Sequence, residues 1–232
     1  LTKVSQPKTP SAPRLRPMLA VARSPLAAAG VIVAALSSAS FRMVGPIYGQ
    51  EVGLRPDQIA YFLAAFVLGG ALAQYPIGWL ADKFDRRWVL IGLSVAAVIS
   101  CMVANVIGAG STAAIMAGAV FFGLTTFPIY SVAAAHAHDF ASDDERVELS
   151  AALMFFFALG AIASPLVSST LINWYGPSAL FIMIAAGHVA LIFFGLFRMR
   201  ARDTVSERTP YVYAPRTSFV IGRLSKGLRR KR

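Results

Sequence analysis

Residues 78–87 read Gly78-Trp79-Leu80-Ala81-Asp82-Lys83-Phe84-Asp85-Arg86-Arg87. Five of these ten residues are charged, whereas the segments on both sides are uncharged. The 24 residues of Gln58–Ala81 and the 51 residues of Trp88–His138 contain no Asp, Glu, Lys or Arg. Because charged side chains are costly in the hydrocarbon core of a bilayer, a charged loop between two such segments indicates a membrane protein.

The composition of the whole chain agrees with this interpretation. Of the 232 residues, 56% are hydrophobic and 14% are charged, against about 25% charged residues in soluble domains. Two further uncharged segments are Ser24–Phe41, with 18 residues, and Leu149–Phe197, with 49. About 20 helical residues cross a bilayer core, so the two longest segments must each fold back once. The alternative, a large soluble protein with buried helices, is not favoured, because its helices would need polar faces and these segments show almost none.

Six membrane spans are therefore predicted, and the fold class is all-α integral membrane. Breaks at 108–111 and 173–177 divide the two longest segments. Prolines that follow Ser24, Arg55 and Gly176 suit the first turn of a helix, and the run 142–145 has the pattern of a capping box. The predicted spans are 25–48, 57–80, 88–107, 112–138, 143–172 and 177–198.

The basic residues near the span ends predict the orientation. Within 20 residues of a span, thirteen Lys and Arg residues lie on the side that holds both termini, and Arg55 stands alone on the other side. Both termini are therefore expected in the cytoplasm, in a multi-pass protein of the cell (inner) membrane. The expected domains are a basic cytoplasmic linker over 1–24, a six-helix transmembrane bundle over 25–198 and a disordered, basic cytoplasmic tail over 199–232.

The net charge of +11 does not predict nucleic-acid binding, because the basic residues follow the topology and belong to no recognition fold. The distal tail, 223–232, either touches anionic lipid headgroups or is simply solvated. Cys101 is the single cysteine and lies inside a span, so neither an intramolecular disulfide nor a cysteine-based metal site is expected. No cofactor is expected.

The pattern Gly78-x-Leu80-Ala81-Asp82-Lys83-x-x-Arg86-Arg87-x-x-Leu90 resembles the signature loop of the major facilitator superfamily. In that family the loop joins the second and third helices of a six-helix half on the cytoplasmic side, which is its predicted place here. Asp85 stands where the family usually has glycine. The wider runs 73–86 and 126–133 are similar to the second half of the uncharacterised bacterial YcaD-type permeases.

The resemblance covers about 25–198 and implies one major-facilitator half bundle. Family members have two six-helix halves with the substrate between them at the midplane, and this chain would supply helices seven to twelve. The linker 1–24 would join the halves. A start at Leu1 rather than Met is expected of a fragment, a split gene product or an unusual start codon. The expected partners are membrane lipid, a small-molecule substrate and a missing N-terminal six-helix half or a second copy.

The resemblance also assigns a cytoplasmic gate motif to the loop. Its residues are Gly78, Asp82, Lys83, Arg86 and Arg87. Asp82 would be the gate acceptor near a helix N-terminus of the opposite half, which stabilises a carboxylate, and Arg86 and Arg87 would be its basic partners. The alternative is that the loop only sets topology and solubility.

Polar residues inside the spans are the candidates for the substrate cavity. Arg42 lies about two thirds along the first span, where it either binds an anionic group of a substrate or extends to the outer interface. Gln74, Tyr75 and Tyr130 are further candidates, although such side chains often only hydrogen-bond a neighbouring helix. Pro128 is expected to kink the fourth span.

Histidines could suggest a metal site, but their spacing does not favour one. His136 and His138 are two residues apart on a helix and point about 200° away from each other. They are expected at the inner C-terminal end of the fourth span, where the helix dipole favours positive charge. His188 is expected to be a packing residue in the last span. No metal site is therefore expected.

We expect half of a secondary active transporter that moves a small solute by alternating access. An enzyme is not expected, because the chain has no nucleophile–base pair or metal cluster. The alternative is a non-transporting membrane component, such as a truncated or degenerate half or an assembly partner.

Overall fold

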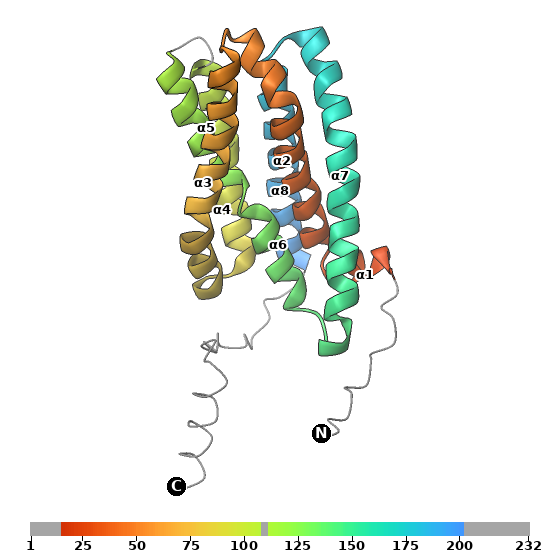
Figure 1. Cartoon of the computed structure of the whole chain (residues 1–232). Helices are drawn as coiled ribbons and strands as arrows, with labels where there is room; N and C mark the ends of the chain where they lie inside the picture. The colour runs from red at the N-terminus through yellow and green to blue at the C-terminus, as the bar shows by residue number, and fades with distance from the viewer. Residues whose placement is uncertain (1–14, 108–110, 202–232) are drawn as a thin grey trace, which may run out of the picture.

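The computed structural model describes residues 15–107 and 111–201, and every regular element in this part is helical. The six long helical stretches, with α5 and α6 counted as one, run alternately in the two directions, so α2 begins and α8 ends at the same end of the bundle (Figure 1). The elements are α1 (Pro17–Arg23), α2 (Pro25–Glu51), α3 (Pro56–Lys83), α4 (Arg86–Ile107), α5 (Thr112–Thr126), α6 (Ile129–His138), the 3₁₀ helix η1 (Asp143–Glu145), α7 (Arg146–Tyr175) and α8 (Ala179–Ala201).

Six stretches of this part are long and apolar enough to cross a membrane: α2, α3, α4, α5 with α6, η1 with α7, and α8. The predicted all-α membrane fold is confirmed, and the predicted spans match these stretches within a few residues. One start is corrected: α8 begins at Ala179, because Pro177 and Ser178 form a turn before it. The predicted disordered tail from residue 202 onward and the linker before residue 15 lie outside the described residues.

Side-chain caps start several helices. Ser24 Oγ accepts a hydrogen bond from the backbone N–H of Ala27 at 3.1 Å, at the start of α2. At the start of η1 the predicted capping box is present, and in it the backbone N–H of Ser142 donates to Glu145 Oε2 at 3.3 Å. Such caps satisfy backbone groups that have no partner inside the helix. They therefore set where α2 and the η1–α7 stretch begin.

Two hydrophobic clusters form the core, one towards each end of the bundle. We call the end with the α3–α4 loop the loop end. The loop-end cluster includes Leu26, Leu90, Ile129, Leu149 and Leu153. The phenylalanine cluster, towards the opposite end, includes Phe41, Phe62, Phe66, Phe122 and Phe181. Phe41 is fully buried in it, with the Phe62 and Phe66 ring centroids at 4.8 and 4.5 Å.

Glycines let α3 and α5 approach at backbone distance. A Cβ added to Gly69 would lie 2.1 Å from the carbonyl oxygen of Val120, and one added to Gly123 would lie 2.0 Å from that of Phe66. Both positions therefore require glycine, as is common where membrane helices pack closely. This crossing holds α3 beside α5 and so fixes one wall of the candidate site described below.

The fourth span is broken into α5 and α6. Phe127 and Pro128 separate the two helices, and the proline has no N–H to donate to the preceding turn. The predicted kink at Pro128 is confirmed. The break lies at mid-depth, and it directs the Phe127 and Tyr130 side chains to a hollow in the bundle.

Candidate functional site

A hollow of about 220 Å³ lies between α2, α3, α7 and the α5–α6 break. Phe127 packs against the phenylalanine cluster, whereas Tyr130 and Phe157 pack against the loop-end cluster. The hollow is therefore at the depth where the two clusters meet, near the middle of the bundle. Its lining residues are Ala34, Ser38, Arg42, Gln74, Thr126, Phe127, Tyr130, Ser131 and Phe157.

Arg42 brings a positive charge to this hollow. Its guanidinium carbon lies 5.7 Å from the centroid of the Phe127 ring, which is within cation–π distance. Within the described part of the chain, none of the ion pairs includes Arg42. The hollow thus carries a cationic group whose charge no acidic side chain of that part neutralises.

The other polar groups of the hollow are hydroxyls and an amide. Tyr130 donates to Met154 Sδ at 3.1 Å, and its ring meets that of Phe157 edge-on with centroids 5.3 Å apart. Ser131 Oγ donates to Gln74 Oε1 at 3.5 Å and so links α6 to α3. These groups can donate and accept hydrogen bonds, and among the described lining residues they include no nucleophile–base pair.

Three of the four predicted cavity residues line the hollow: Arg42, Gln74 and Tyr130. Tyr75 does not, because it follows Gln74 by one residue on a helix and so points about 100° away; it is 85% exposed. Ser38 was missed, although it precedes Arg42 by four residues and such pairs share a helix face. The contribution of Phe157 from α7 had no signal in the sequence.

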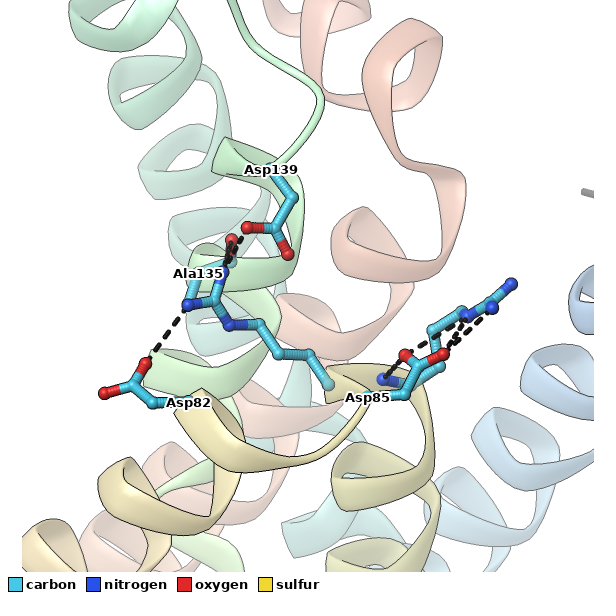
Figure 2. A network of polar contacts seen from close by, with 6 residues as sticks. Asp82, Asp85, Ala135 and Asp139 are labelled. Carbon is cyan, nitrogen blue, oxygen red and sulfur yellow. Dashed lines mark hydrogen bonds and ion pairs between the residues drawn. The ribbon is translucent and has the colours of Figure 1, made fainter. Parts of the chain in front are cut away.

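A second group of polar residues lies at the α3–α4 loop and is centred on Arg86. Arg86 Nη2 donates to Asp82 Oδ1 at 3.2 Å, and Arg86 Nη1 donates to Asp139 and, at 3.1 Å, to the carbonyl oxygen of Ala135. Figure 2 shows the carboxylates of Asp82 and Asp139 at opposite sides of one guanidinium group. One side chain therefore connects the end of α3, the start of α4 and the end of α6.

Asp139 was not predicted as part of this network. It follows the last residue of α6, where the helix dipole disfavours a negative charge, and its ion pair with Arg86 compensates for that cost. The carbonyl oxygen of Ala135, in the last turn of α6, accepts from the backbone N–H of Asp139 at 3.2 Å as well as from Arg86. The only signal in the sequence was a carboxylate at the same end of the bundle as the basic loop.

Asp85, which replaces the usual glycine of the family pattern, caps α4. Its Oδ1 atom accepts a hydrogen bond from the backbone N–H of Arg87 at 2.9 Å, and its Oδ2 atom pairs with Arg87 Nη2 at 2.9 Å (Figure 2). The structure therefore pairs Arg87 with Asp85, and Arg86 with the predicted acceptor Asp82.

The remaining residues of the predicted gate motif are Gly78 and Lys83. Gly78 is exposed, and a Cβ added there would meet nothing within 4 Å. Lys83 Nζ lies 4.9 Å from the ring centroid of Trp79 and 5.9 Å from that of Phe84. All five motif residues thus lie at the loop end, and Asp82 and Arg86 contact each other.

The short helix α1, which was not predicted, is attached to η1 and to the start of α7. Arg16 pairs with Glu148 at 3.3 Å, and Arg23 pairs with Glu145. The hydrogen bond from Arg23 to Glu145, together with the carboxylate charge, raises the pKa of Arg23 above its ordinary value. Ala20 is fully buried between these contacts.

The histidines take part in helix contacts. His188 is fully buried, and its Nε2 atom lies 2.9 Å from Ser37 Oγ, between α8 and α2. His138 Nε2 lies 3.2 Å from Ser150 Oγ of α7, whereas the His136 ring meets Phe140 edge-on. Within residues 15–107 and 111–201, no group of three or more potential ligands is placed to hold a metal ion.

Comparison with known proteins gives consistent matches. Residues 27–230 match the family model of the Major Facilitator Superfamily. An uncharacterised MFS-type transporter of Yersinia pestis (strain Pestoides F) is 34% identical over 196 residues, which are 84% of this chain and 48% of that protein. The uncharacterised MFS-type transporter YcaD of Escherichia fergusonii is 31% identical over 188 residues, or 81% and 47% of the two chains. The chain spans about half the length of the curated relatives it matches.

Proposed function

This chain belongs to the major facilitator superfamily, and from that premise we propose that it is one half of a secondary transporter for a small anionic solute. The solute binds in the hollow around Arg42 and crosses the cell (inner) membrane by alternating access. Both termini lie in the cytoplasm, and a six-helix N-terminal half or a second copy of the chain completes the transporter. The family and the names of the relatives are those of transporters rather than enzymes.

The observation that carries the proposal is the position and charge of the hollow. It lies at mid-depth and is lined by residues from four of the six membrane-spanning stretches. In secondary transporters of this kind the substrate lies near the midplane, at the contact between two repeats. The second half would cover the hollow from the side of α3 and α7.

An anionic substrate is favoured because Arg42 has no acidic partner in the described part of the chain. A cation within a membrane is costly unless water or an opposite charge accompanies it. The guanidinium group is planar and binds a carboxylate or a phosphate through two parallel hydrogen bonds. The hydroxyls of Ser38 and Tyr130 and the amide of Gln74 add neutral groups that orient the solute.

The Asp82–Arg86–Asp139 network is this half's contribution to the cytoplasmic gate. Arg86 fixes Asp82 at the end of α3, with its carboxylate half-exposed towards the loop end. A helix N-terminus of the opposite half would bind this carboxylate when the gate is closed. Arg87, paired with Asp85, holds the start of α4 in place, while Gly78 and Lys83 complete the motif.

The test is solute uptake by membrane vesicles that contain this chain, a six-helix N-terminal half, or both. We would offer radiolabelled acetate, benzoate, succinate and inorganic phosphate as probes. Uptake of at least one anion only when both halves are present supports the proposal. If the chain neither transports nor associates stably with any N-terminal half or second copy, it is instead a non-transporting membrane component.

A further inference from the structure

An apolar groove of about 470 Å³ lies where α3 ends and α4 begins. Its volume is within the range of small-molecule sites. The lining residues have no polar side chain apart from the indole of one tryptophan. They include Ile77, Leu80 and Phe84 from the α3 side and Trp88, Gly92 and Leu93 from the α4 side.

The groove opens on the lipid-facing side of α4. The exposed large apolar residues of this helix are three, four or seven residues apart. They therefore lie along one face of the helix. Trp88 and Gly92, which line the groove, belong to the same face. The members of this face are Trp88, Gly92, Val95, Ile99, Met102 and Val106.

A cation lies at the loop end of the groove. Lys83 Nζ is 5.9 Å from the ring centroid of Phe84, which lines the groove, and 4.9 Å from that of Trp79. Among the described residues, the acids of the α3–α4 loop pair with Arg86 and Arg87, and no ion pair includes Lys83. The groove therefore combines an apolar channel with a positive charge that no acidic side chain of this part neutralises.

We propose that an anionic phospholipid binds here, with one acyl chain in the groove and its phosphate at Lys83. From Ile77 to Phe84 the helix rises about 10 Å, which fits within one leaflet of a hydrocarbon core about 30 Å thick. The amphipathic Trp79 and Trp88 lie at the level of the charge, as aromatic residues do at the membrane interface. The proposal rests on membrane insertion alone and is independent of transport.

The chemistry of the groove favours an acyl chain over a protein segment. A peptide in the groove would bring backbone N–H and C=O groups that need hydrogen-bond partners in a water-free setting, and the lining residues offer almost none. An acyl chain has no such requirement. The charge at Lys83 then selects an anionic headgroup, because one basic residue near the surface attracts such lipids about fivefold.

The test is quenching of Trp88 fluorescence by brominated lipids. A chain with the substitutions Trp79→Phe and Trp174→Phe, which keeps Trp88 as its only tryptophan, is reconstituted in phosphatidylcholine vesicles. Brominated phosphatidylglycerol is expected to reach half-maximal quenching at about a fivefold lower mole fraction than brominated phosphatidylcholine. Equal mole fractions for the two lipids would overturn the proposal.

Substitutions test whether the preference for phosphatidylglycerol depends on Lys83 and on the groove. Lys83→Gln is expected to abolish the preference for phosphatidylglycerol, whereas Arg200→Gln, at the same end of the bundle, retains it. Gly92→Leu fills the groove, since a Cβ there meets nothing within 4 Å, and should abolish the preference as well. Val106→Leu, on the same face of α4, retains it.

A thermal unfolding midpoint like that of the parent chain shows that Lys83→Gln is folded. A preference that survives in folded Lys83→Gln contradicts the proposal. Quenching that disappears as the protein-to-lipid ratio rises would also contradict it and would assign the groove to a second copy of the chain.

Discussion

The guanidinium group of Arg42 lies over the ring of Phe127, with 5.7 Å between its carbon and the ring centroid. The two residues come from different membrane spans, and Phe127 stands at the break between α5 and α6. The break thus supplies an aromatic support for a charge at mid-depth.

Replacing Arg42 should remove anion binding. We expect carboxylates or inorganic phosphate to raise the thermal unfolding midpoint of the full chain in detergent. Arg42→Gln should weaken the apparent affinity about tenfold or more, because a hydrogen bond to a charged group contributes about 1.5–3 kcal/mol. Arg42→Lys should retain part of the affinity for anions, since lysine keeps the positive charge but lacks the planar guanidinium group. An unchanged midpoint shift in Arg42→Gln would place anion binding elsewhere, and Arg200→Gln is the matched control.

Gly70→Ala should disturb the hollow without altering any of its lining residues. A Cβ at Gly70 would lie 2.4 Å from Cγ of Phe127, so the ring must move away and Arg42 loses its support. We expect a several-fold weaker response to anions in the same thermal assay, by loss of a cation–π contact of about 0.5–1 kcal/mol or more. Gly92→Ala, where nothing lies within 4 Å, is the control and should respond like the parent chain.

Arg86 should couple Asp82 to Asp139. Arg86→Gln is expected to lower the free energy of unfolding by about 1–2 kcal/mol, because it breaks two ion pairs and exposes the end of α6. A double-mutant cycle with Asp139→Asn should show a coupling energy above about 0.5 kcal/mol. Arg55→Gln, which breaks one exposed pair with Asp57, should cost less. Additive effects of the Arg86 and Asp139 substitutions would exclude the network.

The helix cap of Asp85 and its ion pair with Arg87 should make distinguishable contributions to the free energy of unfolding. Asp85→Ala is expected to lower the free energy of unfolding by about 1 kcal/mol, as loss of an N-cap usually does. Asp85→Asn keeps an oxygen that accepts from the Arg87 N–H and loses only the charge, so it should cost less. Chemical unfolding in mixed detergent measures both values. Equal losses in the Ala and Asn variants would show that the charge, rather than the cap, holds α4.

The six membrane spans, the kink in the fourth span and the charged loop could be predicted because each depends on local sequence. Uncharged length defines a span, a proline such as Pro128 breaks a helix, and the charges of the loop mark its topology. The joint position of Arg42, Gln74 and Tyr130 in one hollow also agrees with the expectation that all three are cavity residues, although their role in binding stays a prediction.

Contacts between distant segments were not predictable from one sequence. Asp139 carries no local sign that Arg86, 53 residues away, will pair with it. The requirement for glycine at positions 69 and 123 arises only from the close crossing of α3 and α5. Helix α1 is only seven residues long, too short to be stable on its own, and its attachment to Glu145 and Glu148 depends on the tertiary fold.

Thiol labelling of Ser38→Cys tests most directly the claim that the hollow around Arg42 is the substrate site. Cys101, the single native cysteine, is fully buried, so labelling reports on the new thiol. In vesicles that contain both halves, we predict that a membrane-impermeant thiol reagent reacts with residue 38 and that the transported anion protects it. Ile99→Cys, on the lipid-facing side of α4, should stay unlabelled. Absence of labelling at residue 38 from either side of the membrane, in protein that still transports, would show that the hollow is not the substrate site.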